Sequence, residues 1–203
     1  MSLFSEKRIE QYLAENDNQA IARINSTVLP TEDKAVEAAQ RLADANKINT
    51  VSIELKNART EVIIEEIHSS QIDPFRFPEP EKSYPHAAVL FKVPIQGNTF
   101  LLRCSPRTFS SNQPSASISG ATLVLKIQTQ YANENLSTEV EGTVRRNAIS
   151  EMERIQANID DLNAEVEVYN QNLYSRLHAI IQEKIAAEKE KKVRENRLNP
   201  FAQ

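Results

Sequence analysis

The spacing of hydrophobic residues divides the chain into four zones, and the first, residues 1–48, has a helical pattern. A short amphipathic segment covers Glu6–Glu15. After Pro30, Thr31 is a candidate N-cap for a second helix, because small hydrophobic residues follow it at helical spacing. These residues are Ala35, Ala38, Ala39, Leu42 and Ala43. The first zone is therefore predicted to be a helical N-terminal segment.

The second zone begins at residue 49, where the period changes from helical to alternating. Val51, Ile53 and Leu55 alternate with polar residues, which indicates a half-buried strand. Glu61–Ile67 is rich in β-branched residues and predicts a returning strand, although a helix over Thr60–Ser69 is the competing interpretation. Residues 73–85 contain four prolines and predict an extended surface connection, because proline disrupts helices and central strands.

The third zone, residues 86–130, is predicted to be an antiparallel meander. Its first hairpin would join Ala87–Ile95 to Thr99–Cys104 through the turn Gln96-Gly97-Asn98, with Gly97 at positive φ. The second would join Ser115–Ser119 to Ala121–Gln130 around Gly120. Together these zones predict a mainly antiparallel β domain over residues 49–133.

The fourth zone, residues 134–197, predicts one long helix, followed by a tail at 198–203. Its hydrophobic residues recur at alternating spacings of three and four, as in a coiled coil. The stripe comprises Met152, Ile155, Ile159, Leu162, Val166, Tyr169 and Leu173. It could cover this chain's own sheet, but it is longer than a small sheet, so at least part of it should pack against another helix or another subunit. We favour the second interpretation, assign these residues to an interface between subunits and expect a homo-oligomer. The predicted fold class is α+β.

The amino-acid composition argues against several classes of function. The 203 residues are 40% hydrophobic and carry a net charge of −4, which argues against a dedicated nucleic-acid binder. No apolar run is long enough to span a membrane and no signal peptide is apparent, so we expect a cytoplasmic protein. One cysteine and three scattered histidines do not form a zinc site, and three separate glycines do not form a phosphate-binding loop. We therefore expect no cofactor and no metal.

Two candidate catalytic arrangements can be weighed. Glu54 and Lys56 follow a strand, with Asp44 ten residues earlier, as in metal-dependent nucleases of the PD-(D/E)XK type. The same Glu-x-Lys spacing recurs at Glu32 and Glu190, so solvated surfaces explain it more simply. Cys104 follows Arg103, a cation that would lower the pKa of the thiol, but a buried, inert cysteine is the commoner case. We assign no catalytic residue.

The β domain has no acidic residue between Pro85 and Asn133. Its cations are therefore candidates for contact with an anion, either a phosphate backbone or an acidic protein. A packed sheet that avoids buried carboxylates is the favoured alternative. The candidate residues are Lys92, Arg103, Arg107 and Lys126.

One stretch resembles a segment of uncharacterised bacterial proteins. It comprises Val93-Pro94-Ile95-x-Gly97-Asn98-x-x-Leu101-Leu102, then Pro106-x-Thr108-Phe109-Ser110-x-Asn112-x-Pro114. The similarity covers about residues 89–195 and includes the long helix with its basic end. Ile95 and Asn98 stand where the family usually has Phe and Asp. In that family a separate PD-(D/E)XK nuclease-like domain follows, which implies a role in bacterial defence or DNA processing. We expect no such effector domain before Gln203.

These observations lead to one main hypothesis and two alternatives. The main hypothesis is a non-enzymatic interaction or assembly module, which oligomerises through its long helix and scaffolds or senses for a partner effector, as in defence against phage. The first alternative is a nuclease or nuclease subunit that uses Glu54 and Lys56. The second is a DNA-binding module that uses the surface around Arg103 and Arg107. We also expect Phe109 to be buried against the sheet, as an aromatic residue in a polar loop.

Overall fold

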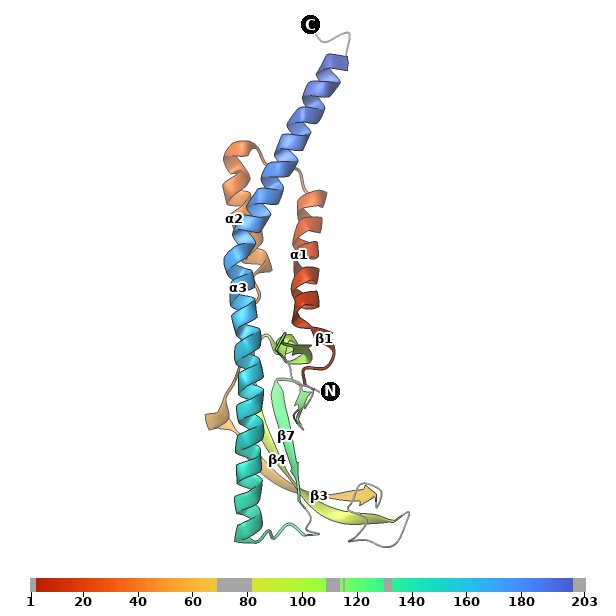
Figure 1. Ribbon diagram of the computed structural model, residues 1–203, viewed down its shortest axis with the longest axis vertical. Helices are drawn as coiled ribbons and strands as arrows, with labels where there is room; N and C mark the ends of the chain where they lie inside the picture. Colours follow the sequence, from red (N-terminus) through yellow and green to blue (C-terminus); the bar gives the residue numbers. More distant parts are fainter. Residues whose placement is uncertain (1–2, 69–81, 109–113, 115, 130–132, 199–203) are drawn as a thin grey trace. The chain divides into compact units, whose positions relative to one another are not determined.

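The computed structural model confirms a mixed α+β fold, with a helical N-terminal segment, an antiparallel sheet and a long C-terminal helix (Figure 1). It describes residues 3–68, 82–108, 114, 116–129 and 133–198. The chain forms two compact units that are discontinuous in sequence. The sheet unit is residues 1–7 and 51–162, and the helical unit is residues 8–50 and 163–203. These units cut across the consecutive zones expected from the sequence.

The helical unit contains α1 (Ile9–Ser26), the short 3₁₀ helix η1 (Glu32–Lys34), α2 (Ala35–Asn46) and the C-terminal half of α3. α1 is 18 residues long and extends well beyond the short segment predicted at Glu6–Glu15. The buried side chains of α2 are spaced four, four and three residues apart: Ala35, Ala39, Ala43 and Asn46. The second predicted helix is thus confirmed, although Thr31 precedes η1, and Lys34 is the N-cap of α2.

The sheet unit is built around β4 (Ser83–Gly97), its longest strand. β2 (Val51–Ile53) and β3 (Arg59–His68) pair one after the other with the same edge of β4, joined by the 3₁₀ helix η2 (Leu55–Asn57). β7 (Thr122–Gln128) pairs with the other edge of β4, and β6 (Ala116–Ser119) pairs with β7. All these pairings are antiparallel, so the strand at Glu61–Ile67 is confirmed and the competing helix is wrong.

One face of this sheet carries the core of the unit. Alternate residues of β7 are buried, namely Leu123, Leu125 and Ile127, as the alternation in the sequence predicts. Ile127 also lines a small hollow together with Val140 and Val144 of α3, so the start of α3 packs on this face. The hairpin around Gly120 is confirmed, with Gly120 at φ 60° between β6 and β7.

The two prolines of β4 occupy positions that do not need a backbone N–H. The expectation that 73–85 is an extended surface connection outside any central strand is wrong at its end, since β4 already begins at Ser83 and includes Pro85. Pro85 pairs with Glu66 of β3 but lies beyond the last residue paired with β7. Pro94 lies between the segment of β4 that pairs with β2 and the segment that pairs with β3. Its carbonyl oxygen accepts a hydrogen bond from the Glu54 N–H at 2.9 Å, and no N–H is needed at this position. The rest of the predicted connection, 73–81, lies outside the described residues.

The predicted hairpin after β4 is wrong. Residues 99–103 form a 3₁₀ helix, η4 (Thr99–Arg103), and only β5 (Cys104–Ser105) is extended, paired with β1 (Lys7–Arg8). The Asn98 side chain accepts a hydrogen bond from the Phe100 N–H at 3.1 Å and so caps the helix. Leu101 and Leu102 are both fully buried, which neighbouring residues of a half-exposed strand are not. Gly97 does have the predicted positive φ, 82°.

The long helix is confirmed as one continuous element, α3 (Thr138–Leu198), 61 residues and about 92 Å long at ~1.5 Å per residue. It begins after Ser137, whose hydroxyl accepts a hydrogen bond from the Val140 N–H at 3.4 Å, and two glutamates follow in its first turn. None of the helices in the described part of the chain is long and apolar enough to cross a membrane.

Candidate functional site

The candidate nuclease residues are not arranged for catalysis. The Glu54 carboxylate accepts hydrogen bonds from the side-chain amides of Asn57, at 2.7 Å, and Gln96. Lys56 is exposed on the 3₁₀ helix η2 rather than on a strand. Asp44 belongs to the helical unit, whereas Glu54 and Lys56 belong to the sheet unit. Within the described ranges, no three His, Cys, Asp or Glu side chains form a group that could hold a metal ion.

Cys104 is fully buried, and its thiol lies 3.7 Å from the carbonyl oxygen of Phe100 as a donor. Its neighbour Arg103 packs over the Phe100 ring, 5.6 Å from the ring centroid, and forms an ion pair with Glu6 at 3.8 Å. The arginine is thus engaged with other groups. A thiol in this position has no access for a substrate, so the structure favours the inert interpretation of Cys104.

The cations of the acid-free segment do not form a free basic surface. Lys92 and Lys126 are each paired with a carboxylate of β3, Glu61 and Glu65 respectively, and the second pair is 2.9 Å apart. Arg103 is paired with Glu6, as described above, and Arg107 also interacts with another residue. The acids that neutralise this sheet come from segments earlier in the chain, which is why the local sequence indicated an excess of positive charge.

The stripe predicted as an interface, from Met152 to Leu173, is covered by the chain itself, and we call it the α3 seam. Ile155, Ile159, Leu162 and Val166 are fully buried, Leu173 and Tyr169 are at most 5% exposed, and Met152 is half-buried. The C-terminal half of the seam packs against α1 and the end of α2, which is the alternative in which another helix covers the stripe. Whether copies of the chain also associate remains a prediction, but these buried residues are not available for it.

A partly buried polar cluster around Tyr169 joins the three helices of the helical unit. The Tyr169 hydroxyl accepts a hydrogen bond from the Asn16 amide at 2.8 Å and donates one to Asp17 at 2.9 Å. Arg176 forms an ion pair with the same Asp17 at 2.7 Å and lies over the Tyr169 ring. The Asn170 side chain donates to the Ile48 carbonyl oxygen at 2.8 Å and accepts from the Ile48 N–H at 3.0 Å.

The pKa of Tyr169 is raised from 10.0 to about 12, chiefly by burial and in part by the neighbouring Asp17, against the lowering effects of Asn16 and Arg176. A tyrosine used as an acid or a base near neutral pH would need its pKa shifted in the opposite direction. The cluster therefore holds α1, the end of α2 and α3 together and is not a reaction centre.

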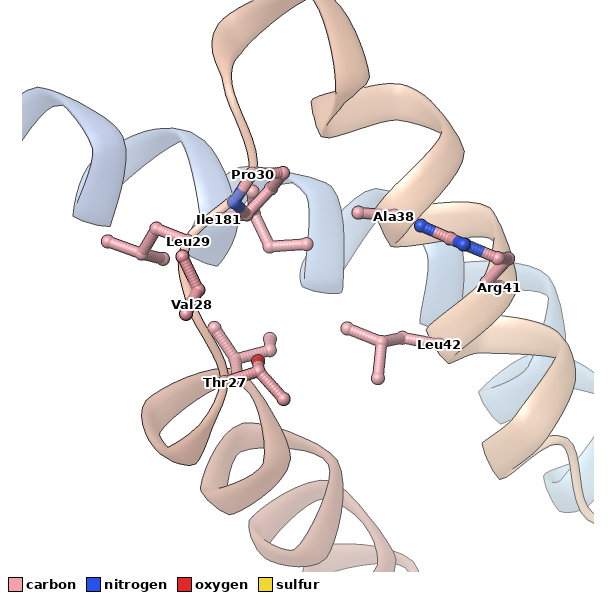
Figure 2. Close-up of a pocket in the computed structure, with 9 residues that line it drawn as sticks. Thr27, Val28, Leu29, Pro30, Ala38, Arg41, Leu42 and Ile181 are labelled. Atoms are coloured by element: carbon pink, nitrogen blue, oxygen red, sulfur yellow. The ribbon is translucent and has the colours of Figure 1, made fainter.

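The best candidate for a functional surface is a groove beside the loop that joins α1 to α2. Figure 2 shows this loop, Thr27–Pro30, opposite Leu42 of α2, whose side chain points into the gap, and Ile181 of α3. The hollow has a volume of about 300 Å³. A second hollow of about 570 Å³ adjoins the same loop on the side of α3. We call these two hollows the loop groove.

The loop groove has apolar walls and a basic rim. Val28, at its centre, is 97% exposed, the most exposed large hydrophobic residue in the described part of the chain. Lys184, Lys191 and Lys192 line the hollow on the side of α3, together with Glu188. Lys191 lies 3.9 Å from Glu195, whereas Lys184 and Lys192 make no ion pair within the described residues. The groove is thus an apolar surface with spare positive charge beside it.

Sequence reasoning missed this site. The available signal was the run Val28-Leu29-Pro30, three hydrophobic residues in a connection between two helices. Turn segments are usually polar, so such a run indicates either a buried plug or a contact surface. The high exposure of Val28 favours a contact surface over a buried plug. That exposure depends on how α1, α2 and α3 pack, which a local sequence pattern does not indicate. Phe109, the residue for which we expected burial, lies outside the described residues.

Comparison with known proteins gives no further guidance, since no family model, no curated protein and no solved structure matches this chain.

Proposed function

We propose that the chain is a cytoplasmic, non-enzymatic interaction module that binds a segment of a partner effector protein in the loop groove. The observation that carries this proposal is the exposed Val28 between an apolar hollow and a second, mixed hollow whose lysines Lys184 and Lys192 make no ion pair in the described part of the chain. Exposed apolar patches with polar rims are typical of protein contact surfaces. A setting in bacterial defence rests on the resemblance of residues 89–195 alone.

The lining of the groove defines the chemistry of the partner segment. Its apolar walls suit a short helix or extended peptide with two or three large hydrophobic side chains. Its rim suits glutamates or aspartates, because Lys184 and Lys192 have no competing partner in the described structure. The partner segment is therefore acidic and amphipathic, and its affinity falls as salt screens the lysines.

Peptide display against the whole chain tests this proposal. We expect the selected peptides to be rich in large hydrophobic and acidic residues and to lose binding to a Val28→Glu variant. Val36→Glu is the matched control, because Val36 is also an exposed valine, 55% accessible, but lies on α2 outside the groove. Double charge reversal, Lys184→Glu with Lys192→Glu, should weaken binding at least tenfold, or ~1.4 kcal/mol.

Two outcomes would contradict the proposal. One is a selection without such enrichment, and the other is equal loss of binding in the Val28→Glu and Val36→Glu variants. The nuclease alternative is tested separately by incubating the protein with plasmid DNA and Mg²⁺. Plasmid cleavage by the wild type that is lost in a Lys56→Ala variant would show that the chain is a nuclease and not an interaction module.

A further inference from the structure

The edge of β3 that faces away from β4 offers a second surface, and the pairing of β4 shows which backbone groups lie there. The Ile95 N–H donates to the Ala121 carbonyl and the Ala87 carbonyl accepts from the Thr129 N–H, both at 2.9 Å. Odd-numbered residues of β4 therefore direct their backbone groups toward β7. Because these groups alternate along a strand, the even-numbered residues direct theirs toward β2 and β3.

The register of the β3–β4 pairing shows which residues of β3 direct their backbone groups toward β4 and which direct them outward. Even-numbered residues of β4 are paired with odd-numbered residues of β3, for example Leu90 with Glu61 and Ala88 with Ile63. The even-numbered residues of β3 thus direct their N–H and C=O groups outward. Between Thr60 and Glu66, no described residue forms a backbone hydrogen bond with these outward groups.

This edge lacks two of the usual protections against pairing, although it does carry an arginine and three glutamates. β3 is ten residues long and contains no proline and no lysine. Ile64 is 40% exposed, and Val62, on the same side of the sheet, is half-buried. The side chains of Glu61 and Glu65 form ion pairs with Lys92 of β4 and Lys126 of β7, respectively. A long edge of this kind is a template for an added strand.

We propose that β3 of a second copy of this chain pairs antiparallel with this edge, with Val62 opposite Val62 across a two-fold axis. In this register Arg59 of each copy lies opposite Glu65 of the other, which gives two complementary charge pairs. Moving the axis to Ile63 would set Glu61 opposite Glu65 twice, which is repulsive. Moving it to Ile64 gives no charge pair. Centring the axis on Thr60 would also set Arg59 opposite an acid, Glu61, but it would align only the first three residues of β3. Charge and the length of the paired segment together favour the register centred on Val62.

The expected complex is a weak, reversible dimer. The paired segment, Arg59–Glu65, is one short strand from each copy, and a contact of this size lies in the range of transient interfaces. The proposal does not depend on binding in the loop groove, because β3 belongs to the sheet unit and the groove to the helical unit. It also differs from the interface predicted at the α3 seam, whose residues are buried within each chain.

A proline substitution in β3 can abolish the pairing between two copies without unfolding the chain. In Val62→Pro the lost N–H points away from β4, so the variant keeps its own sheet, while the new strand loses two hydrogen bonds at the centre of the pairing. Analytical ultracentrifugation should show a concentration-dependent dimer of the 23.0 kDa wild-type chain and only monomer for Val62→Pro. Val62→Thr, which retains the N–H, is the matched control and should still dimerise. Circular dichroism verifies that both variants are folded.

Cysteine cross-linking tests the register. Cα atoms of a hydrogen-bonded antiparallel pair are ~5.5 Å apart, within reach of a disulfide. Val62→Cys should therefore form a covalent dimer under mild oxidation, whereas Val36→Cys, exposed on α2 and outside the paired strand, should not. The native Cys104 is fully buried and does not interfere.

A charge reversal completes the test. Arg59→Glu should weaken the dimer at least tenfold, and Lys56→Glu, which makes the same change on the exposed helix η2, should not. The proposal is overturned by a wild-type mass of one chain at all accessible concentrations, by a dimer that persists in folded Val62→Pro, or by equal cross-linking of Val62→Cys and Val36→Cys.

Discussion

Replacing Tyr169 by phenylalanine removes one oxygen atom from the centre of the helical unit and leaves the ring in place. The lost hydroxyl makes two hydrogen bonds, one from Asn16 at 2.8 Å and one to Asp17 at 2.9 Å. Neither partner becomes isolated, because Asn16 still donates to the Asn46 carbonyl at 2.7 Å and Asp17 still pairs with Arg176. We therefore expect a loss of about 1–2 kcal/mol in the free energy of unfolding at neutral pH, without a larger penalty for a buried unpaired group.

The pH dependence of this loss provides a sharper test. The pKa of Tyr169 is about 12 in the folded chain, against 10.0 for an ordinary tyrosine. A raised pKa means that the folded state favours the protonated hydroxyl. The resulting stabilisation is complete below pH 10 and disappears as the pH rises through 12, at a total of about 3 kcal/mol. The stability difference between wild type and Tyr169→Phe should thus be constant below pH 10 and shrink above it.

Urea unfolding followed by circular dichroism at a series of alkaline pH values measures both effects. The other ionisable groups are common to both proteins, so their contributions cancel in the difference. A variant as stable as wild type at neutral pH would refute the hydrogen-bond argument. A difference that stays constant to pH 12 would refute the argument that burial raises the pKa of Tyr169.

Three further predictions concern stability. Ile159→Ala, at a fully buried position of the α3 seam, should cost about 2–5 kcal/mol, and an unchanged unfolding midpoint would contradict its burial. Gly97→Val, at φ 82°, should lower the melting temperature through a backbone strain of ~1 kcal/mol or more, and an unaltered melting curve would argue against the positive φ. Gly142→Ala should raise the melting temperature, by ~0.5–1 kcal/mol of stability, because Gly142 lies in α3 and an added Cβ would meet only the Arg146 guanidinium at 3.8 Å; a lower melting temperature would refute this.

The elements that the sequence predicts well are those governed by local pattern. Three patterns repeat over several residues: the alanines of α2, the alternation of β7 and the heptad spacing of α3. In each case the repeated residues form one apolar face, which is buried by packing. β3 was ambiguous between strand and helix in the sequence, because its apolar residues are adjacent rather than alternating. Pairing with β4 along its full length, from Arg59 to His68, decides the matter in favour of the strand.

The elements that the sequence predicts poorly depend on contacts distant in the chain. Leu101 and Leu102 form a 3₁₀ helix because Asn98 caps it and both side chains find buried positions, which an alternating pattern does not anticipate. The acid-free segment appears basic until β3 brings Glu61 and Glu65 beside it. The α3 seam looks like a subunit interface until α1 and α2 are known to cover it, and the loop groove exists only once those helices are packed.

The division of α3 between the two units has a consequence for the order of events during synthesis. α1 and α2 leave the ribosome before residues 51–162 of the sheet unit, but the surface that buries Ala20, Ile24 and Ala39 is completed by residues from Asn163 onward. The nascent helices thus remain without their partner until the C-terminal half of α3 emerges, when the intervening chain must form a long closed loop. The helical unit, although its first helices precede the sheet, is therefore completed after the sheet unit.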